Sequence, residues 1–162
     1  MRDLRRGAVV ALVLGCVPAL GTQPAAAAGP RFVSASAVVG AGGLDVPFAE
    51  VGLPAGVSVA DQARADATVA YGCGSGGRWT DGNASEMVSA PVSRVGRFVP
   101  GSDGSVRAVL SLSTPGPGGF ACPPGEQVVL TSVTYANVSV TDVTNGVDRP
   151  VSGTFAQIRV GP

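Results

Sequence analysis

Residues 62–73, QARADATVAYGC, alternate between apolar and polar side chains with a period of two. This alternation is typical of a β-strand that has one buried face. The apolar side ends in Tyr71 and Cys73, where a disulfide can tie the strand to another part of the core. The opposite side carries polar residues such as Arg64 and Asp66. We therefore predict that residues 62–73 lie in the central strand of an all-β domain.

Short alternating segments, separated by turns rich in glycine and proline, occupy most of the remaining chain. The predicted strands are 31–39, 44–51, 57–73, 85–99 (one long strand or two short ones), 105–113, 127–135, 137–144 and 147–160. No part of the chain after residue 28 shows the 3.6-residue period of a helix. Many short strands with such turns favour a sandwich or a barrel. We predict an immunoglobulin-like antiparallel β-sandwich of about 8–10 strands, because a disulfide between strand and loop suits a sandwich.

Local signals add detail to this fold. Pro47 lacks a backbone donor, so residues 44–51 are expected at an edge or in a bulge. A bend is expected near Asp61. The turn PGSDG at 100–104 is expected to join its flanking strands as a hairpin. The proline- and glycine-rich residues 114–125 are expected to form no regular structure.

The last third of the chain is expected to close the domain. In residues 127–135 the alternation predicts one shared face for Gln127, Val129, Thr131, Val133 and Tyr135. Asn145-Gly146 favours a turn that matches strand twist. The apolar anchors expected after this turn are Val151, Phe155, Ile158 and Val160.

The N-terminus has the features of an export signal. A basic start, MRDLRR, precedes an apolar run at 7–20 and the small residues at 25–28. This order is typical of a signal peptide that is removed after export. We predict a signal peptide at 1–28 and a single secreted domain at 29–162, without a transmembrane segment. The alternative is a lipid anchor on Cys16, but the residues after it stay apolar where a polar tether is expected.

Two cysteines, Cys73 and Cys122, remain once residues 1–28 are removed. Two cysteines in an exported chain are expected to pair, and two free thiols are the alternative. The loop closed by this disulfide would contribute about 4 kcal/mol to stability in the chain-entropy model. Phe120 is expected to enter the core beside the disulfide.

Charge and the lack of histidine limit the functions available. Residues 29–162 contain eight arginines and ten carboxylates, a net charge of −2, and no lysine or histidine. The arginines form no stripe, so we do not expect a nucleic-acid partner. Without histidine there is no Ser-His-Asp or Cys-His set, and we expect no catalytic residue and no enzyme activity. A polysaccharide hydrolase based on two facing carboxylates is the remaining enzymatic alternative, and the sequence singles out no pair.

Two short segments could supply oxygen ligands to a metal. Asp81-Gly82-Asn83 and Ser102-Asp103-Gly104 both place acidic or amide side chains beside glycine. Neither has the several carboxylates at alternating spacing that calcium loops use. Both are typical of tight turns, in which Asp and Asn bond their own backbone. We therefore expect no metal site and no cofactor.

The glycine-rich loop at 72–84 contains the only tryptophan, Trp79, next to Arg78 and near Asp81. Tryptophan combines a large apolar ring with a polar N–H and is enriched at binding hot spots. These three residues are the candidate binding site for an extracellular glycan or protein. The alternative is that Trp79 folds back and covers the open end of the sandwich.

Three segments carry a resemblance to known proteins: YGC at 71–73, FACPPGE at 120–126 and TSVTYANVSVTDVTNG at 131–146. With them the chain resembles a group of small secreted actinobacterial proteins without an established activity. The resemblance covers residues 31–160 and implies a β-sandwich fold. More loosely, the chain is similar to the neocarzinostatin-type apoproteins, secreted immunoglobulin-like sandwiches that hold a small molecule in a cleft. Those proteins have two disulfides, whereas this chain can form one.

These observations favour a secreted, non-enzymatic β-sandwich that acts as a binding or envelope-associated module. The alternative is a carrier that holds a small apolar molecule in a cleft between the sheets.

Overall fold

The computed structural model describes residues 29–76, 78–79 and 84–158, and in these ranges the chain is all-β, with no helix. None of the described residues belongs to a helix that could cross a membrane. The ten strands are β1 (Arg31–Ala35), β2 (Val38–Gly40), β3 (Gly43–Val51), β4 (Val59–Ser75), β5 (Arg78–Trp79), β6 (Ser85–Phe98), β7 (Val106–Ser113), β8 (Gln127–Asp142), β9 (Val147–Pro150) and β10 (Phe155–Ile158).

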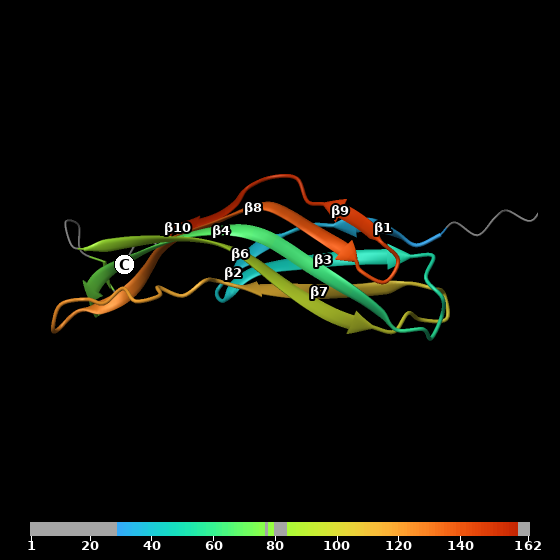
Figure 1. Cartoon of the computed structure of the whole chain (residues 1–162), viewed down its shortest axis with the longest axis horizontal. Coiled ribbons are helices and arrows are strands. Elements are labelled where there is room, and N and C mark those ends of the chain that lie inside the picture. The colour runs from blue at the N-terminus through green and yellow to red at the C-terminus, as the bar shows by residue number, and fades with distance from the viewer. Residues whose placement is uncertain (1–28, 77, 80–83, 159–162) are drawn as a thin grey trace, which may run out of the picture.

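The strands form two antiparallel sheets, as in a β-sandwich (Figure 1). In the small sheet, β3 pairs with β1 and β2 on one side and with β7 on the other. In the large sheet, β4 lies between β6 and β8, while β9 and β10 pair with β8 and β5 pairs with β4. The core lies between the sheets and is lined by alternate residues of β3, β4, β7 and β8.

The predicted central strand is confirmed. β4 pairs with β6 and β8 along most of its length, and its alternate residues from Val59 to Cys73 are buried. The small side chains Ala63, Ala65 and Ala67 lie on this buried face in the middle of the strand. β4 is therefore the element against which both the small sheet and the neighbouring long strands are positioned.

The two sheets differ in length, and this divides the molecule into two regions. β4, β6 and β8 contain 14 to 17 residues, whereas the strands of the small sheet contain at most nine. The large sheet therefore continues past the small one, toward the left in Figure 1. In this region the partner of the large sheet is the segment 114–126, which forms no strand. The sequence predicts this irregular structure for residues 114–125. We call this region the disulfide end, after the bond between Cys73 and Cys122. We call the opposite region the acidic end, after Glu50, Asp61 and Asp142.

The predicted strand at 31–39 is interrupted, and Pro47 explains the break. β1 and β2 both pair with β3 and are separated at residues 36–37. The amide of Ser36 donates to the carbonyl of Pro47, which has no N–H to return a bond. β3 itself lies inside the small sheet, so the expectation of an edge strand was wrong and the irregularity falls on its neighbour instead.

The hairpin predicted around residues 100–104 was wrong. β6 belongs to the large sheet and β7 to the small one, so this turn crosses from one sheet to the other. The carbonyl of Gly104 accepts a bond from the amide of Leu53, and Gly104 has a positive φ of 68°. The turn is thus fastened to the loop after β3 and does not close a two-stranded ribbon.

Residues 127–142 form one strand whose inward face changes along its length. The register with β4 shifts at Ala70/Tyr71 and again at Arg64/Asp66, and Asn137 has a positive φ of 51°. At each irregularity β8 contains one residue more than the paired part of β4. The set of β8 residues that face the core therefore shifts by one position. Val133 and Tyr135 are buried as predicted, but Gln127, Val129 and Thr131 do not share their face.

Two further expectations concern β4 and the end of the chain. Pairing on both sides of β4 continues through Asp61, where a bend was expected, and the register shift with β8 lies near residue 65. Ile158 is exposed and does not anchor the core, whereas Val151 is buried. Val160 lies outside the described residues.

Candidate functional site

Three carboxylates meet in the interior at the acidic end. Glu50 lies near the end of β3, Asp61 near the start of β4, and Asp142 at the end of β8. Asp61 and Asp142 are direct cross-strand partners, and Glu50 belongs to the opposing sheet. All three occupy positions that continue the buried faces of their strands, so they project between the sheets.

The acidic cluster is closed to solvent. The exposed fraction of each residue is 0%, and one carboxylate oxygen from each lies within 4.8 Å of those from the other two. Across the described ranges, no hydrogen-bond donor reaches either carboxylate oxygen of Glu50 or Asp61. Buried polar groups are normally partnered because a lost hydrogen bond to water must be replaced. Four oxygen atoms in this cluster depart from that rule.

Asp142 is different because the turn after β8 holds its carboxylate. Oδ1 accepts bonds from the amides of Thr144 (2.8 Å) and Asn145 (3.0 Å). Oδ2 accepts a bond of 2.5 Å from the side-chain amide of Asn145. The carbonyl of Asp142 also accepts from Gly146, whose φ of 71° lets the chain reverse into β9. The turn therefore fixes the position of this carboxylate relative to the other two.

Burial and mutual repulsion change how the cluster holds protons. Burial, followed by the nearby charges of Asp142 and Asp61, raises the pKa of Glu50 from 4.5 to about 8. Burial, followed by the charge of Asp142, raises the pKa of Asp61 from 3.8 to about 6. Both shifts show that negative charge is unfavourable here without a compensating positive charge.

This cluster gives no support to the polysaccharide hydrolase. A glycosidase needs two carboxylates that flank a bond of the bound sugar, in a site that the sugar can enter. Glu50, Asp61 and Asp142 are fully buried. What the cluster offers chemically is a compact set of oxygen ligands.

The disulfide end has the predicted staple. Cys73 at the end of β4 is bonded to Cys122 in the irregular segment, with their Cα atoms 5.5 Å apart. Phe120 packs against the core, as expected. The hydroxyl of Tyr71 donates to the carbonyl of Pro115. The hydroxyls of Thr114 and Tyr135 are also bonded, at 2.9 Å, so side-chain hydrogen bonds hold this segment over the large sheet.

Trp79 lies on the outer face of the large sheet at the disulfide end. Its exposed fraction is 43%, and it pairs with Gly74 in β4. A Cβ atom placed on Gly72 would lie only 2.5 Å from the indole ring, so the ring rests on the backbone of this glycine. The residue neither covers the open end completely nor projects freely into solvent.

Of the other two residues of the predicted binding site, the structure describes only the backbone of Arg78. The backbone of Arg78 pairs with Ser75, and Asp81 lies outside the described residues. The segment 81–83, considered as a metal loop, is likewise outside them. In the second such segment, Asp103 accepts bonds from the amide and hydroxyl of Ser105, which lower the pKa of Asp103. Asp103 thus has the turn role that the sequence predicts.

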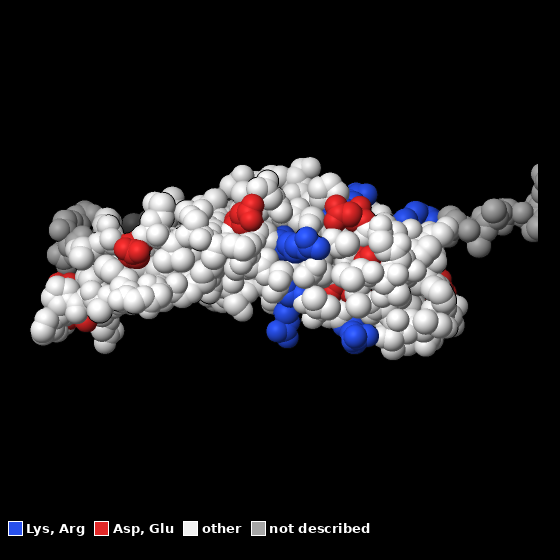
Figure 2. All heavy atoms as spheres, in the orientation of Figure 1, with Lys and Arg blue, Asp and Glu red and all other residues white. Residues whose placement is uncertain are grey.

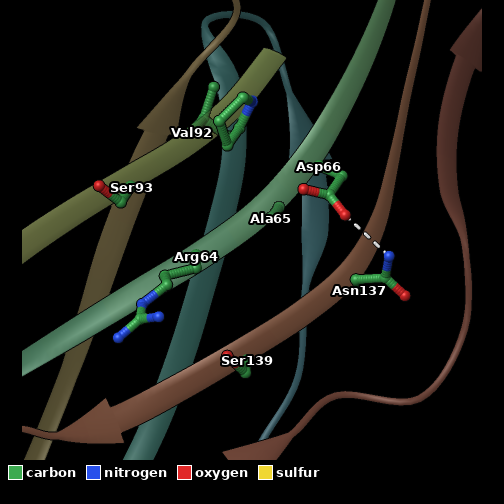
Figure 3. Close-up of a pocket in the computed structure, with 8 residues that line it drawn as sticks. Arg64, Ala65, Asp66, Val92, Ser93, Asn137 and Ser139 are labelled. Atoms are coloured by element: carbon green, nitrogen blue, oxygen red, sulfur yellow. Dashed lines mark hydrogen bonds between the residues drawn. The ribbon is translucent and has the colours of Figure 1, made fainter. Parts of the chain in front are cut away.

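A shallow hollow of about 480 Å³ lies over the middle of the large sheet (Figure 3). Arg64, Asp66 and Ser93 line it, together with Asn137 and Ser139. The side-chain amide of Asn137 donates to Asp66 at 2.8 Å, as the dashed line shows. Because its acidic group is already paired, this hollow is a weaker candidate than the acidic cluster.

Three further hollows have volumes of about 200, 340 and 490 Å³. Their linings include the exposed residues Ala41, Arg149 and Arg94, respectively. A carrier needs an enclosed apolar cavity. The four hollows that we describe are open to solvent and have both polar and apolar residues in their linings, so they give the carrier hypothesis no support.

Comparisons with known proteins return no match, whether with family models, curated proteins or solved structures.

The acidic cluster is the feature that sequence reasoning missed, although part of its signal was present. Glu50 continues the alternation Leu44, Val46, Phe48, and Asp61 precedes Ala63 on the buried face. A carboxylate at an inward position of a strand is uncommon, because burial of an unpaired charge is costly.

Proposed function

We propose that this chain is a secreted, non-enzymatic binding module that recognises a neutral glycan through the outer face of its large sheet. The proposal includes an immunoglobulin-like sandwich for residues 29–162 and a cleaved signal peptide at 1–28. The disulfide is compatible with an extracellular location, because such bonds persist in oxidising compartments.

The observation that carries this proposal is the exposed apolar patch formed by Trp79, Met87 and Ile158. Their exposed fractions are 43%, 70% and 74%. Met87 pairs with Ala70, and Ile158 pairs with Ser132, which also pairs with Ala70. Met87 and Ile158 therefore share one face, about 14 Å apart across three strand spacings.

Trp79 lies on the same face as the other two residues of the patch. Its ring rests on Gly72, which is two positions from Ala70 in β4 and so projects to the same side. An indole fixed against backbone loses little freedom on binding, which favours its use as an anchor. A partly exposed ring held against the sheet is suited to stacking against a sugar ring.

Charge supports a neutral ligand. On the face drawn in Figure 2, the arginines lie over the right half of the molecule. The described surface at the left, where the large sheet continues alone, shows no basic side chain and few acidic ones. A strongly charged ligand would have few complementary groups there.

The test uses the fact that Trp79 is the only tryptophan. We expect the purified chain to bind chitin, cellulose or peptidoglycan sacculi in a pull-down, and soluble fragments of the bound polymer to change tryptophan fluorescence. Trp79→Ala should abolish binding while the melting temperature changes by only a few degrees. The matched control is Val109→Ala, which removes an exposed apolar side chain from the small sheet. Equal binding by Trp79→Ala and wild type would exclude this surface.

A further inference from the structure

The acidic cluster is not explained by glycan binding, because it lies inside the protein at the opposite end of β4 from Trp79. Burying three carboxylates costs far more free energy than burying apolar groups of the same size. The sequence contains no lysine or histidine that could balance them. A proton or a cation must therefore compensate the negative charge at this place.

The arrangement of the oxygen atoms indicates what this group is. Among the described residues, no group donates a hydrogen bond to either oxygen of Glu50 or of Asp61, and both side chains are fully buried. They converge with Asp142 so that one oxygen from each residue lies within 4.8 Å of the other two. Unpartnered buried oxygens that converge on one place are what a metal ion requires.

We propose that Glu50, Asp61 and Asp142 bind one calcium ion between the two sheets.

Calcium fits the ligand set better than other cations. All three ligands are carboxylates, which suit hard cations, and a set without imidazole or thiolate does not favour zinc or copper. The three oxygens lie within 4.8 Å of one another, close enough to bind one ion at the Ca–O distance of about 2.3–2.6 Å. Magnesium usually keeps several waters, which a fully buried site does not accommodate. The second oxygens of Glu50 and Asp61 can raise the number of oxygen ligands above three.

The proposed ion would connect the two sheets. Glu50 comes from β3 of the small sheet, and Asp61 and Asp142 come from β4 and β8 of the large sheet. The two aspartates are also cross-strand partners, and like charges in such a pair repel unless a cation lies between them. A bound calcium ion would thus remove the repulsion between the three carboxylates and join β3, β4 and β8 through its bonds to their oxygens.

The experiment measures the thermal stability of the purified full chain at pH 7.5, first with a chelator and then with calcium or magnesium. A ligand that binds only the folded state raises its stability by mass action. At a calcium concentration of 100 times Kd we expect a rise in melting temperature of about 10 °C. Magnesium at the same concentration should give a much smaller rise. Titration calorimetry should report one calcium ion per chain.

Isosteric variants connect the ion to these residues. Glu50→Gln and Asp61→Asn should each abolish most of the calcium-dependent rise. Their matched controls are Glu86→Gln and Asp66→Asn, which neutralise exposed carboxylates on β6 and β4 and should keep the full rise. A rise of the same size in Glu50→Gln and in Glu86→Gln would overturn the assignment.

The wild-type titration alone also decides the question, even if a variant does not fold. Absence of a calcium effect on melting together with absence of binding heat would overturn the proposal and show that the carboxylates are held by shared protons. A larger effect of magnesium than of calcium would equally contradict it.

Discussion

The two ends of the interior satisfy their polar groups in different ways. At the disulfide end, the hydroxyls of Tyr71 and Tyr135 are hydrogen-bonded, and a covalent bond joins Cys73 to Cys122. At the acidic end, the carboxylate oxygens of Glu50 and Asp61 have no such partner within the part of the chain that the structure describes. Both ends lie on the same buried face of β4, so the strand carries a satisfied site at one end and an unsatisfied one at the other.

This difference separates structural groups from groups that need a ligand. A buried polar group that is fully bonded contributes to a defined fold and requires nothing more. A buried carboxylate without a donor lowers stability until a proton or a cation reaches it. The disulfide end is therefore complete in the protein alone, whereas the acidic end is completed by calcium in our proposal. The predictions below test the two ends separately.

Among the substitutions, the largest effect is expected from loss of the disulfide. The double variant Cys73→Ala/Cys122→Ala should lose about 4 kcal/mol of unfolding free energy, because the unfolded chain gains the freedom of a long loop. Urea denaturation with calcium present would measure this loss. The calcium-dependent rise in melting temperature should persist in this variant, since distant sites act additively. Disappearance of that rise would show that the ends are coupled.

The next effect is the pH dependence of stability in the presence of a chelator. The pKa of Glu50 is about 8 in the folded protein against an ordinary 4.5, and that of Asp61 is about 6 against 3.8. At pH values between the ordinary pKa and the pKa in the folded protein, the folded chain binds more protons than the unfolded chain. The free energy of unfolding therefore falls as pH rises. The loss should begin above pH 4 and be complete slightly above pH 8.

Urea midpoints between pH 4.5 and 8.5 would measure this fall. Excess calcium should reduce or reverse it, because the ion replaces the protons that the carboxylates lose. A stability that rises with pH in chelator would contradict the burial of these carboxylates.

The sequence predicted the disulfide end because its signals are local. The alternation of residues 62–73 identifies a half-buried strand, and the two cysteines in residues 29–162 allow only one intramolecular pairing. Residues 114–125 contain too many prolines and glycines for a strand, so their irregular structure was also predictable. The contact between the Trp79 ring and Gly72 could not be predicted, because it depends on the pairing of β5 with β4.

The acidic end could not be predicted because it depends on contacts between distant residues. Glu50, Asp61 and Asp142 are separated in the sequence and belong to different strands. The inward direction of Asp142 depends on the irregularity at Asn137, which shifts the buried face of β8 by one position. Simple alternation from Tyr135 would have placed Asp142 on the outside. The crossing turn at 100–104 was missed for the same kind of reason, because its contact with Leu53 is not local.

A smaller effect is expected from a substitution that removes the carboxylate of Glu50 when no calcium is present. In chelator at pH 8, Glu50→Met should be more stable than wild type by about 2 kcal/mol, since an apolar side chain of similar volume removes an uncompensated buried group. In saturating calcium the order should reverse. Urea denaturation in both conditions would measure the two differences, and a less stable Glu50→Met in chelator would contradict this account of the acidic end.

The smallest effect is expected at the disulfide end, from Tyr71→Phe. This variant removes the hydroxyl that donates to the carbonyl of Pro115 and should cost about 1 kcal/mol. Limited proteolysis should show faster cleavage within residues 114–125, because that segment loses one of its attachments. An unchanged rate of cleavage would show that the disulfide alone holds the segment.

The most direct test of the central claim is a calcium titration followed by amide-resolved NMR spectra. The account predicts that the amides of Glu50, Asp61 and Asp142 shift with one saturating equivalent of calcium, together with those of Thr144 and Asn145 in the turn after β8. The amide of Cys73, at the other end of β4, should stay in place. Shifts confined to exposed carboxylates, or no shifts at all, would contradict the claim that a cation completes the acidic end.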